Sequence, residues 1–213
     1  MKIQLPLKAI GIAVPLFIFS CSKTEEIEPQ SAHWDYENTD WVNEGYSECA
    51  GTIQSPVDII TSNTIKTDLP NLTFSYSPFQ MKIVDNGHTL QVVNNGTNSV
   101  TYNGIKYDFN QFYYHSEHKL DRTASDMEVH LVHQNATSGA LLVVGFFMTN
   151  GANNPLFDAV LTNWTAEKEI ITSTTIDMNT ILPTDRKYYT YIGSLTTPPC
   201  SQGVKNGSFK YTA

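Results

Sequence analysis

Apolar and polar side chains alternate between residues 126 and 133, which read Asp-Met-Glu-Val-His-Leu-Val-His. A period of two is typical of a β-strand, because successive side chains point to opposite faces of the sheet. Glu128 and His130 are therefore predicted to share one face, and His133 to lie on the other. The two histidines of this strand do not bind one metal together. We interpret His133 as an ordinary hydrogen-bonded histidine.

Short segments with a similar pattern recur between residues 74 and 192. They are rich in Thr, Tyr, Val and Phe, and Asn-Gly pairs between them favour tight turns. Residues 154–164 differ, because apolar side chains recur there at helical spacing and Pro155 suits a first helical turn. We therefore predict a mostly β fold with few helices, whose strands span residues 74–76, 81–85, 89–93, 100–102, 105–114, 127–133, 141–148 and 188–192.

The N-terminal segment has the pattern of an export signal. Lys2 precedes an apolar run over residues 10–19, and a small residue, Ser20, follows the run. This run is too short to cross a membrane as a stable helix. We therefore predict that residues 1–20 form a signal peptide and that the protein is exported.

Residues 18–21, Ile-Phe-Ser-Cys, also resemble a bacterial lipobox. We predict that Cys21 is the lipidated first residue of the mature protein, that residues 21–32 form a solvated tether, and that residues 33–213 form one domain. A plain signal peptide cleaved elsewhere is the alternative. Lipidation predicts a location in the periplasm or at the outer membrane, with the lipid anchor as the only contact with the membrane.

Composition and charge narrow the range of partners. The chain has 213 residues, 40% of them hydrophobic, which is enough for one sizeable globular domain. Its formal net charge of −8 argues against nucleic acid, because a row of phosphates would not be neutralised. A small neutral or soluble ligand is favoured, and the sequence indicates no protein partner.

Two cysteines, Cys49 and Cys200, remain once Cys21 is assigned to lipidation. In an oxidising compartment, a disulfide between them is the economical pairing. It would close a very long loop, for which the chain-entropy argument gives about 5 kcal/mol of stabilisation as an upper figure.

The chain contains seven short motifs whose order and spacing resemble those of one enzyme family. They read His-Trp-Asp-Tyr at residues 33–36, Gln-Ser-Pro-Val-Asp-Ile at 54–59, Asn-Gly-His at 86–88, Gln-Phe at 111–112, Ser-Glu-His at 116–118, Met-Glu-Val-His-Leu-Val-His at 127–133 and Tyr-Ile-Gly-Ser-Leu-Thr-Thr-Pro-Pro at 191–199. Together they resemble the α-class carbonic anhydrases. The resemblance implies a large, mainly antiparallel, twisted β-sheet with a few short helices, and a zinc ion held by three histidines at the floor of a conical cleft.

The resemblance also implies an activity, the reversible hydration of carbon dioxide to bicarbonate and a proton. Carbonic anhydrase is the established example of an enzyme in which zinc brings the pKa of its bound water to about 7. The cofactor implied is therefore zinc, and the implied substrates are carbon dioxide and bicarbonate.

The resemblance assigns roles to residues by position. His130 matches a zinc ligand, and Glu128 matches the carboxylate that accepts its ring proton and orients it, which fits a carboxylate and an imidazole on one strand face. Thr196 would accept the hydrogen bond of the attacking hydroxide, and Glu117 would accept from Thr196 in turn. His88 would carry the proton to buffer, since an ordinary histidine pKa of about 6.5 suits that relay.

Further residues match the surroundings of the zinc site. Gln111 matches a residue that supports the ligands, and the Cys49 and Cys200 pair matches the disulfide of exported members. The wall against which carbon dioxide rests is matched by Val132, Val143, Leu195 and Thr197. Ordinary core packing is the alternative for these apolar residues.

The sequence departs from the family at the first metal ligand. The family has His-x-His after Gln-Phe, whereas this chain has Tyr113, Tyr114 and His115, so Tyr113 falls on the first ligand position and His115 on the second. Relative to the family, an even number of residues is missing before Ser-Glu-His. Such a deletion leaves each side chain up to His115 on the same face of the strand. Sliding Tyr113 onto the second position would spoil the match of Gln111 and Phe112, so we reject that alignment.

A phenol binds zinc only after losing its proton, whose ordinary pKa is about 10. Either Tyr113 ligates as a phenolate and makes zinc a weaker acid, or the site is a two-histidine remnant with weak zinc or none. The chain also stops at Ala213, before the family's last strands, so C-terminal strands are expected to be missing. The hypotheses are a zinc enzyme, a non-catalytic carbonic anhydrase-like binding protein, and a truncated, inactive gene product.

Overall fold

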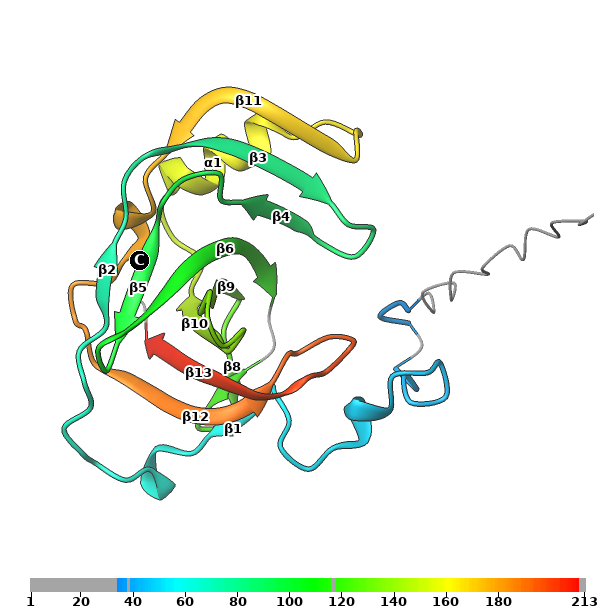
Figure 1. Ribbon diagram of the computed structural model, residues 1–213, viewed down its shortest axis with the longest axis vertical. Helices are drawn as coiled ribbons and strands as arrows, with labels where there is room; N and C mark the ends of the chain where they lie inside the picture. The colour runs from blue at the N-terminus through cyan, green and yellow to red at the C-terminus, as the bar shows by residue number, and fades with distance from the viewer. Residues whose placement is uncertain (1–33, 38, 116–117, 211–213) are drawn as a thin grey trace, which may run out of the picture. The chain divides into compact units, whose positions relative to one another are not determined.

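The computed structural model describes residues 34–37, 39–115 and 118–210 (Figure 1). All of them belong to one compact unit, Ala32–Ala213. For residues 115 and 208–210, which lie in strands, the structure describes the backbone alone.

Two of the predicted functional residues fall outside this range. Cys21, the predicted lipidation site, and Glu117, the predicted partner of Thr196, both lie outside the described residues, as does the predicted signal peptide. In the part of the chain that the structure describes, no helix combines the length and apolar character needed to span a membrane.

Ten strands form one large sheet, in the order β11-β3-β4-β6-β9-β10-β13-β12, with β5 beside β6 and β2 beside β5. Among the described residues, every adjacent pair in this sheet is antiparallel except β10 with β13. The predicted mostly β class and large, mainly antiparallel sheet are therefore confirmed. The strands are β2 (Thr73–Ser75), β3 (Phe79–Asp85), β4 (Leu90–Val93), β5 (Ser99–Tyr102), β6 (Ile105–His115), β9 (Met127–Gln134), β10 (Leu141–Met148), β11 (Glu169–Ile176), β12 (Tyr188–Ser194) and β13 (Gln202–Lys210).

Several strands were not predicted. The short strands β1 (Asp58–Ile59), β7 (Lys119–Leu120) and β8 (Thr123–Ala124) form a separate three-stranded sheet. β11 and β13 belong to the large sheet. β13 contains Asn206 and Gly207, a pair that favours turns, yet it pairs with β10 on one side and β12 on the other. Pairing on both edges overrides the local preference.

The predicted helix is present as α1 (Pro155–Asn163). The Asn154 side chain accepts a hydrogen bond from the Leu156 N–H at 3.0 Å, and Pro155 occupies the first turn. The remaining helical segments are single 3-10 turns, η1 (Ser47–Ala50), η2 (Thr61–Asn63) and η3 (Met178–Ile181).

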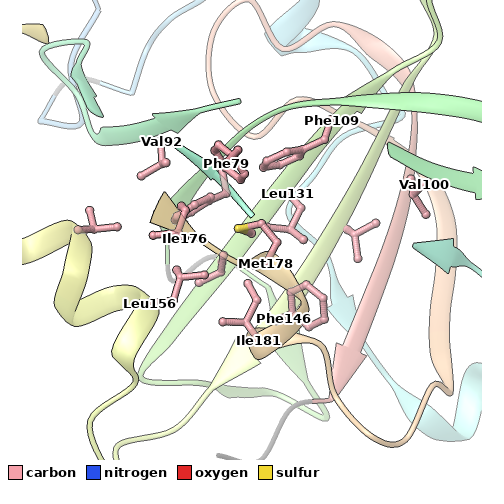
Figure 2. Packing of buried hydrophobic residues seen from close by; sticks show 14 of the residues in the cluster. Phe79, Val92, Val100, Phe109, Leu131, Phe146, Leu156, Ile176, Met178 and Ile181 are labelled. Atoms are coloured by element: carbon pink, nitrogen blue, oxygen red, sulfur yellow. The ribbon is translucent and has the colours of Figure 1, made fainter. Parts of the chain in front are cut away.

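The main hydrophobic core lies on one face of the large sheet. On β9 it contains Val129 and Leu131, and α1 contributes Leu156 (Figure 2). Met178 and Ile181 of η3 pack into the same cluster. The face of β9 that carries Glu128 and His130 is therefore turned away from this core.

The register between β6, β9 and β10 decides which side chains meet on that second face. Tyr113 of β6 lies directly opposite His130 of β9, and His115 lies opposite Glu128. On the other side of β9, Gly145 of β10 is also opposite His130. Directly opposite residues point to the same face of a sheet, so the predicted ligand positions 113 and 130 share one face.

Candidate metal centre

His130 and Glu128 form a buried pair on β9, and each is 1% exposed. His130 Nε2 lies 3.2 Å from Glu128 Oε1. At Gly145, directly across from His130, a Cβ atom would come within 2.6 Å of the same carboxylate oxygen. The glycine therefore leaves the space that the Glu128 carboxylate fills. With the carboxylate at Nε2, Nδ1 is the nitrogen that His130 would offer to a metal.

His118 completes this buried group. Its Nδ1 lies 2.9 Å from Glu128 Oε2, and its backbone N–H donates to the same oxygen at 3.1 Å. Its Nε2 contacts the Tyr191 hydroxyl. His118 belongs to the Ser-Glu-His motif, which could have identified it from the sequence. From that motif we predict a role for the glutamate alone.

The ligand atoms of His118, Glu128 and His130 lie within 4.8 Å of one another, a spacing that permits a shared metal ion. Both ring nitrogens of His118 are already engaged, one with Glu128 and one with Tyr191. An imidazole binds a metal through a free lone pair. We therefore interpret His118 as a support for Glu128 and not as a ligand.

The charge state of Glu128 follows from its neighbours. Burial by itself raises the pKa of this carboxyl, but the charge of His130 and hydrogen bonds from His118 and His130 lower it by more. The pKa of Glu128 therefore lies well below its ordinary value. Glu128 remains an anion that only accepts hydrogen bonds, which is what orienting an imidazole N–H requires.

Tyr113 of β6 lies beside His130. Its ring meets the His130 ring edge-on, with centroids 5.4 Å apart and planes at 75°. The Tyr113 ring is 8% exposed and belongs to a small cluster with Val132, Val143 and Val204. A phenol thus replaces an imidazole next to a well-oriented histidine.

Thr196 carries a buried hydroxyl. Its Oγ1 has no hydrogen-bond partner among the described residues. Leu195, the preceding residue, packs against the cluster that contains Tyr113 and Val132. A buried hydroxyl without a partner among the described residues is available to a hydrogen-bonding ligand.

The Thr196 loop is closed by local bonds and by a disulfide. The Cys200 N–H donates to the Thr197 carbonyl at 2.9 Å, and Cys200 is bridged to Cys49. The predicted Cys49 and Cys200 disulfide is therefore confirmed. Thr196, Pro56 and both cysteines line a cavity of about 560 Å³.

The family described as eukaryotic-type carbonic anhydrase matches residues 36–212. The chain belongs to this family. The carbonic anhydrase of Klebsiella pneumoniae is 36% identical over 198 residues, which cover 90% of this chain and 77% of that protein. The carbonic anhydrase of Nostoc sp. is 33% identical over 216 residues, covering 93% and 80%. The α-carbonic anhydrase of Thermovibrio ammonificans, solved with the inhibitor sulfanilamide, has a TM-score of 0.79 at 33% identity, covering 85% of each chain.

His88, the residue of this carbonic anhydrase chain predicted to carry protons, lies in the turn between β3 and β4. Its ring stacks on Trp34, with centroids 3.6 Å apart and planes 12° apart. Its backbone N–H donates to Asn86 at 2.9 Å. Trp34 in turn meets Trp41 edge-on at 5.6 Å. The imidazole is thus held by an aromatic group from the N-terminal His-Trp-Asp-Tyr motif.

Val132, Val143 and Leu195, the predicted wall for carbon dioxide, belong to the same cluster as Tyr113. Gln111 and Val132 are opposite each other on β6 and β9, and Val132 is opposite Val143 on β10. Leu195 packs against this cluster, and Thr197 is half-buried next to Thr196. For His115 the structure gives the backbone register alone, which places it two residues beyond Tyr113 and opposite Glu128.

Proposed function

We propose that this carbonic anhydrase family member is a zinc enzyme that catalyses the reversible hydration of carbon dioxide to bicarbonate and a proton. The observation that carries the proposal is the buried His130, whose Nε2 lies 3.2 Å from the Glu128 carboxylate while its register partner is Tyr113. A buried imidazole with an anion at one nitrogen is prepared to bind a cation at the other.

The donor set supports zinc at this face. His115 and His130 would supply imidazoles and Tyr113 would supply a phenol oxygen, from positions of β6 and β9 that are close in the strand register. Nitrogen and oxygen donors of this kind suit a divalent zinc ion. When bound, zinc would acidify a water molecule and so supply hydroxide near neutral pH.

Other residues of the chain would orient the ligand, position the hydroxide and substrate, and transfer the proton. Glu128 holds the His130 ring, and the buried hydroxyl of Thr196 would accept a hydrogen bond from the attacking hydroxide and aim it at the substrate. Val132 and Val143 offer an apolar wall for carbon dioxide. His88, stacked on Trp34, would take the released proton toward solvent.

Tyr113 also supports the alternative of a non-catalytic binding protein. A phenolate ligand reduces the acidity of zinc, and an un-ionised phenol would leave only two histidines. Replacing Tyr113 by histidine restores the family's donor set, so this substitution separates the two functions.

The test is to measure zinc content and carbon dioxide hydration of the purified chain, of Tyr113→His and of His130→Ala. We expect the wild type to bind zinc one-to-one and to turn over, Tyr113→His to be faster at neutral pH, and His130→Ala to lose more than about 100-fold in zinc affinity. His133→Gln, on the other face of the same strand, is the control and should keep its zinc. A metal-free, inert wild type that only Tyr113→His activates would contradict the proposal.

We further propose that a lipid on Cys21 holds the enzyme at the cell envelope. The lipobox-like residues 18–21 support this location. The wild type should therefore partition with membranes, whereas Cys21→Ser should be released into the soluble fraction. Equal partitioning of both proteins would argue for a plain signal peptide.

A further inference from the structure

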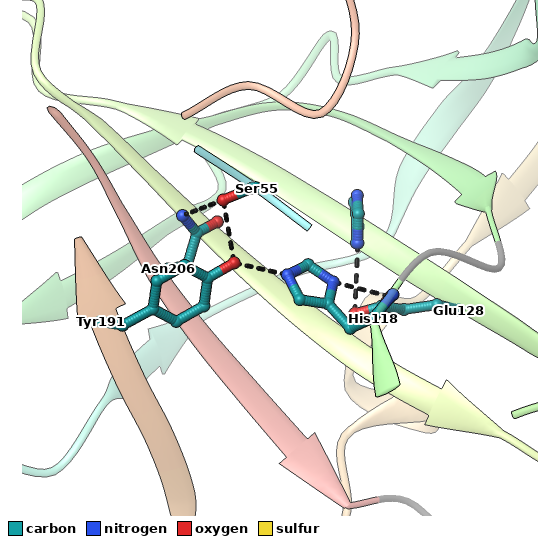
Figure 3. Close-up of polar contacts among 6 residues, drawn as sticks. Ser55, His118, Glu128, Tyr191 and Asn206 are labelled. Carbon is teal, nitrogen blue, oxygen red and sulfur yellow. Dashed lines mark hydrogen bonds and ion pairs between the residues drawn. The ribbon is translucent and has the colours of Figure 1, made fainter. Parts of the chain in front are cut away.

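A series of hydrogen bonds leads away from Glu128 and ends on β13 (Figure 3). His118 Nδ1 contacts Glu128 Oε2 at 2.9 Å, and His118 Nε2 contacts the Tyr191 hydroxyl. The Tyr191 hydroxyl lies 2.8 Å from Ser55 Oγ, which lies 3.2 Å from Asn206 Nδ2. The series joins β9, β12 and β13 through two buried or half-buried hydroxyls.

The direction of these bonds can be read from the Asn206 end. Asn206 Nδ2 also lies 3.3 Å from the Val204 carbonyl, which only accepts, so this atom is the amide NH₂. Ser55 Oγ accepts from Asn206 and, at 3.2 Å, from the Ser194 backbone N–H. Both of its lone pairs are then used. Ser55 must therefore donate its hydrogen to Tyr191.

The Glu128 end gives the same direction. Glu128 is an anion and only accepts, so the His118 nitrogen that faces it, Nδ1, carries the hydrogen. In a neutral imidazole the other nitrogen, Nε2, is then an acceptor. Tyr191 must donate to it. All the hydrogens therefore point from Asn206 toward Glu128.

The Glu128 carboxylate also determines which nitrogen of His130 carries hydrogen. Oε2 of Glu128 is occupied by the two N–H donors of His118, and Oε1 is the oxygen that lies 3.2 Å from His130 Nε2. His130 therefore carries its hydrogen on Nε2 and its lone pair on Nδ1. Glu128 therefore fixes both tautomers, and the Asn206 end decides where the Tyr191 hydrogen points. We propose that Asn206 is a positioning residue: by donating to Ser55 it leaves Ser55 to donate to Tyr191, so that Tyr191 donates to His118 Nε2 and holds His118 against Glu128. This inference rests on the proposed function, because the Nδ1 lone pair matters only if His130 binds a metal.

The close packing around Ser55 supports a specific role for its hydrogen bonds. At Gly193 of β12, a Cβ atom would clash with Ser55 Oγ and would come within 3.0 Å of Asn206 Nδ2. Asn206 is 4% exposed and lies opposite Tyr191 on β12 and Val143 on β10. The amide is thus held in place on the same face as the metal centre.

The test uses Asn206→Asp, because a carboxylate accepts from Ser55 where the amide donates. Histidine ring nitrogens of the full chain, labelled with ¹⁵N, report directly which nitrogen carries hydrogen. In the wild type we expect His118 protonated on Nδ1 and His130 on Nε2. In Asn206→Asp, Ser55 turns its hydrogen toward the new carboxylate and accepts from Tyr191, so His118 Nε2 loses its hydrogen bond and the ¹⁵N resonance of this unprotonated nitrogen shifts, while Glu128 keeps the hydrogen on Nδ1. Zinc affinity, measured by chelator competition, should fall about tenfold.

Asn98→Asp is the matched control, since Asn98 is also buried, at 1% exposure, and its side chain bonds to Asn94 and Ser77. It should leave the resonance of His118 Nε2 unchanged. Asn206→Leu removes the donor without adding charge and decides the question if Asn206→Asp does not fold. A wild-type resonance of His118 Nε2 in the folded Asn206 variants would overturn the proposal. If the wild type binds no zinc, the proposed function fails, while the ring-nitrogen spectra still decide the role of Asn206.

Discussion

His133 is fully buried on the face of β9 that points away from the metal centre. Its Nδ1 lies 3.3 Å from the Leu142 carbonyl, and its Nε2 lies 2.6 Å from the Tyr76 hydroxyl. Because a carbonyl only accepts, Nδ1 carries the hydrogen and Tyr76 donates to Nε2. Burial lowers the pKa of His133 to about 4, although backbone hydrogen bonds raise it in part. The folded protein therefore holds this ring neutral.

Neutral His133 makes folding sensitive to acid. Between its folded pKa of about 4 and its ordinary value of 6.5, the unfolded chain binds a proton that the folded chain does not. The stability linked to His133 is therefore complete above the ordinary pKa and is lost as the pH falls toward the folded one. We expect this loss to be about 2 kcal/mol between about pH 7.5 and about pH 5.

Urea unfolding at the two pH values measures this effect, and His133→Gln should remove that part of the pH dependence. Tyr76→Phe is the control, because it deletes the hydroxyl but keeps the imidazole buried and should retain the pH dependence. If His133→Gln unfolds with the wild-type pH dependence, other groups are responsible for it.

Gly145 gives a second prediction at the level of one residue. Gly145→Ala places a methyl group within 2.6 Å of Glu128 Oε1 and must displace the carboxylate from His130. We expect zinc affinity to fall about 10- to 100-fold, as measured by chelator competition. Gly207→Ala, on β13, is the control because its Cβ would be 3.7 Å from the nearest atom. Equal zinc affinities for the two variants would show that Glu128 does not orient His130.

At the scale of elements, the capping interaction at the N-terminus of α1 can be tested by mutation. The sequence predicts the start of this helix only approximately. Asn154 accepts from the Leu156 N–H, so Asn154→Ala leaves that donor without its cap. We expect a loss of about 1 kcal/mol in the free energy of unfolding. Asn153→Ala, one residue earlier and exposed, should cost far less. A similar loss in both variants would mean that the cap contributes nothing.

The local pattern of apolar and polar residues predicts helices and strands well. It predicts poorly which residues far apart in the sequence come into contact. The alternation around His130 and the length of β6, β9 and β10 identify these strands, and a period of two is enough to place Glu128 beside His130. The roles of His118 and Asn206 do not follow from pattern. Asn206 meets Ser55 across 151 positions of sequence, and only the pairing of β13 with β10 and β12 brings it there.

At the scale of the whole molecule, the Cys49 and Cys200 disulfide joins residues 151 positions apart. It connects the N-terminal part of the domain to the loop that carries Thr196, whereas His130 and Glu128 are held independently by the pairing of β9 with β6 and β10. Stability and loop order should therefore depend on the disulfide more than metal binding does. Closing so long a loop restricts the unfolded chain and typically stabilises a protein by about 2–5 kcal/mol.

We expect the double variant Cys49→Ser, Cys200→Ser to lose about 2–5 kcal/mol in free energy of unfolding, measured with urea under oxidising conditions. Reductant should bring the wild type to the same value and leave the double variant unchanged, which separates loss of the bridge from the effect of the serines. Carbon dioxide hydration should fall in the folded double variant because the Thr196 loop is released, while zinc content stays the same because the sheet still holds His130. Loss of zinc together with activity would instead mean that the disulfide supports the metal centre itself.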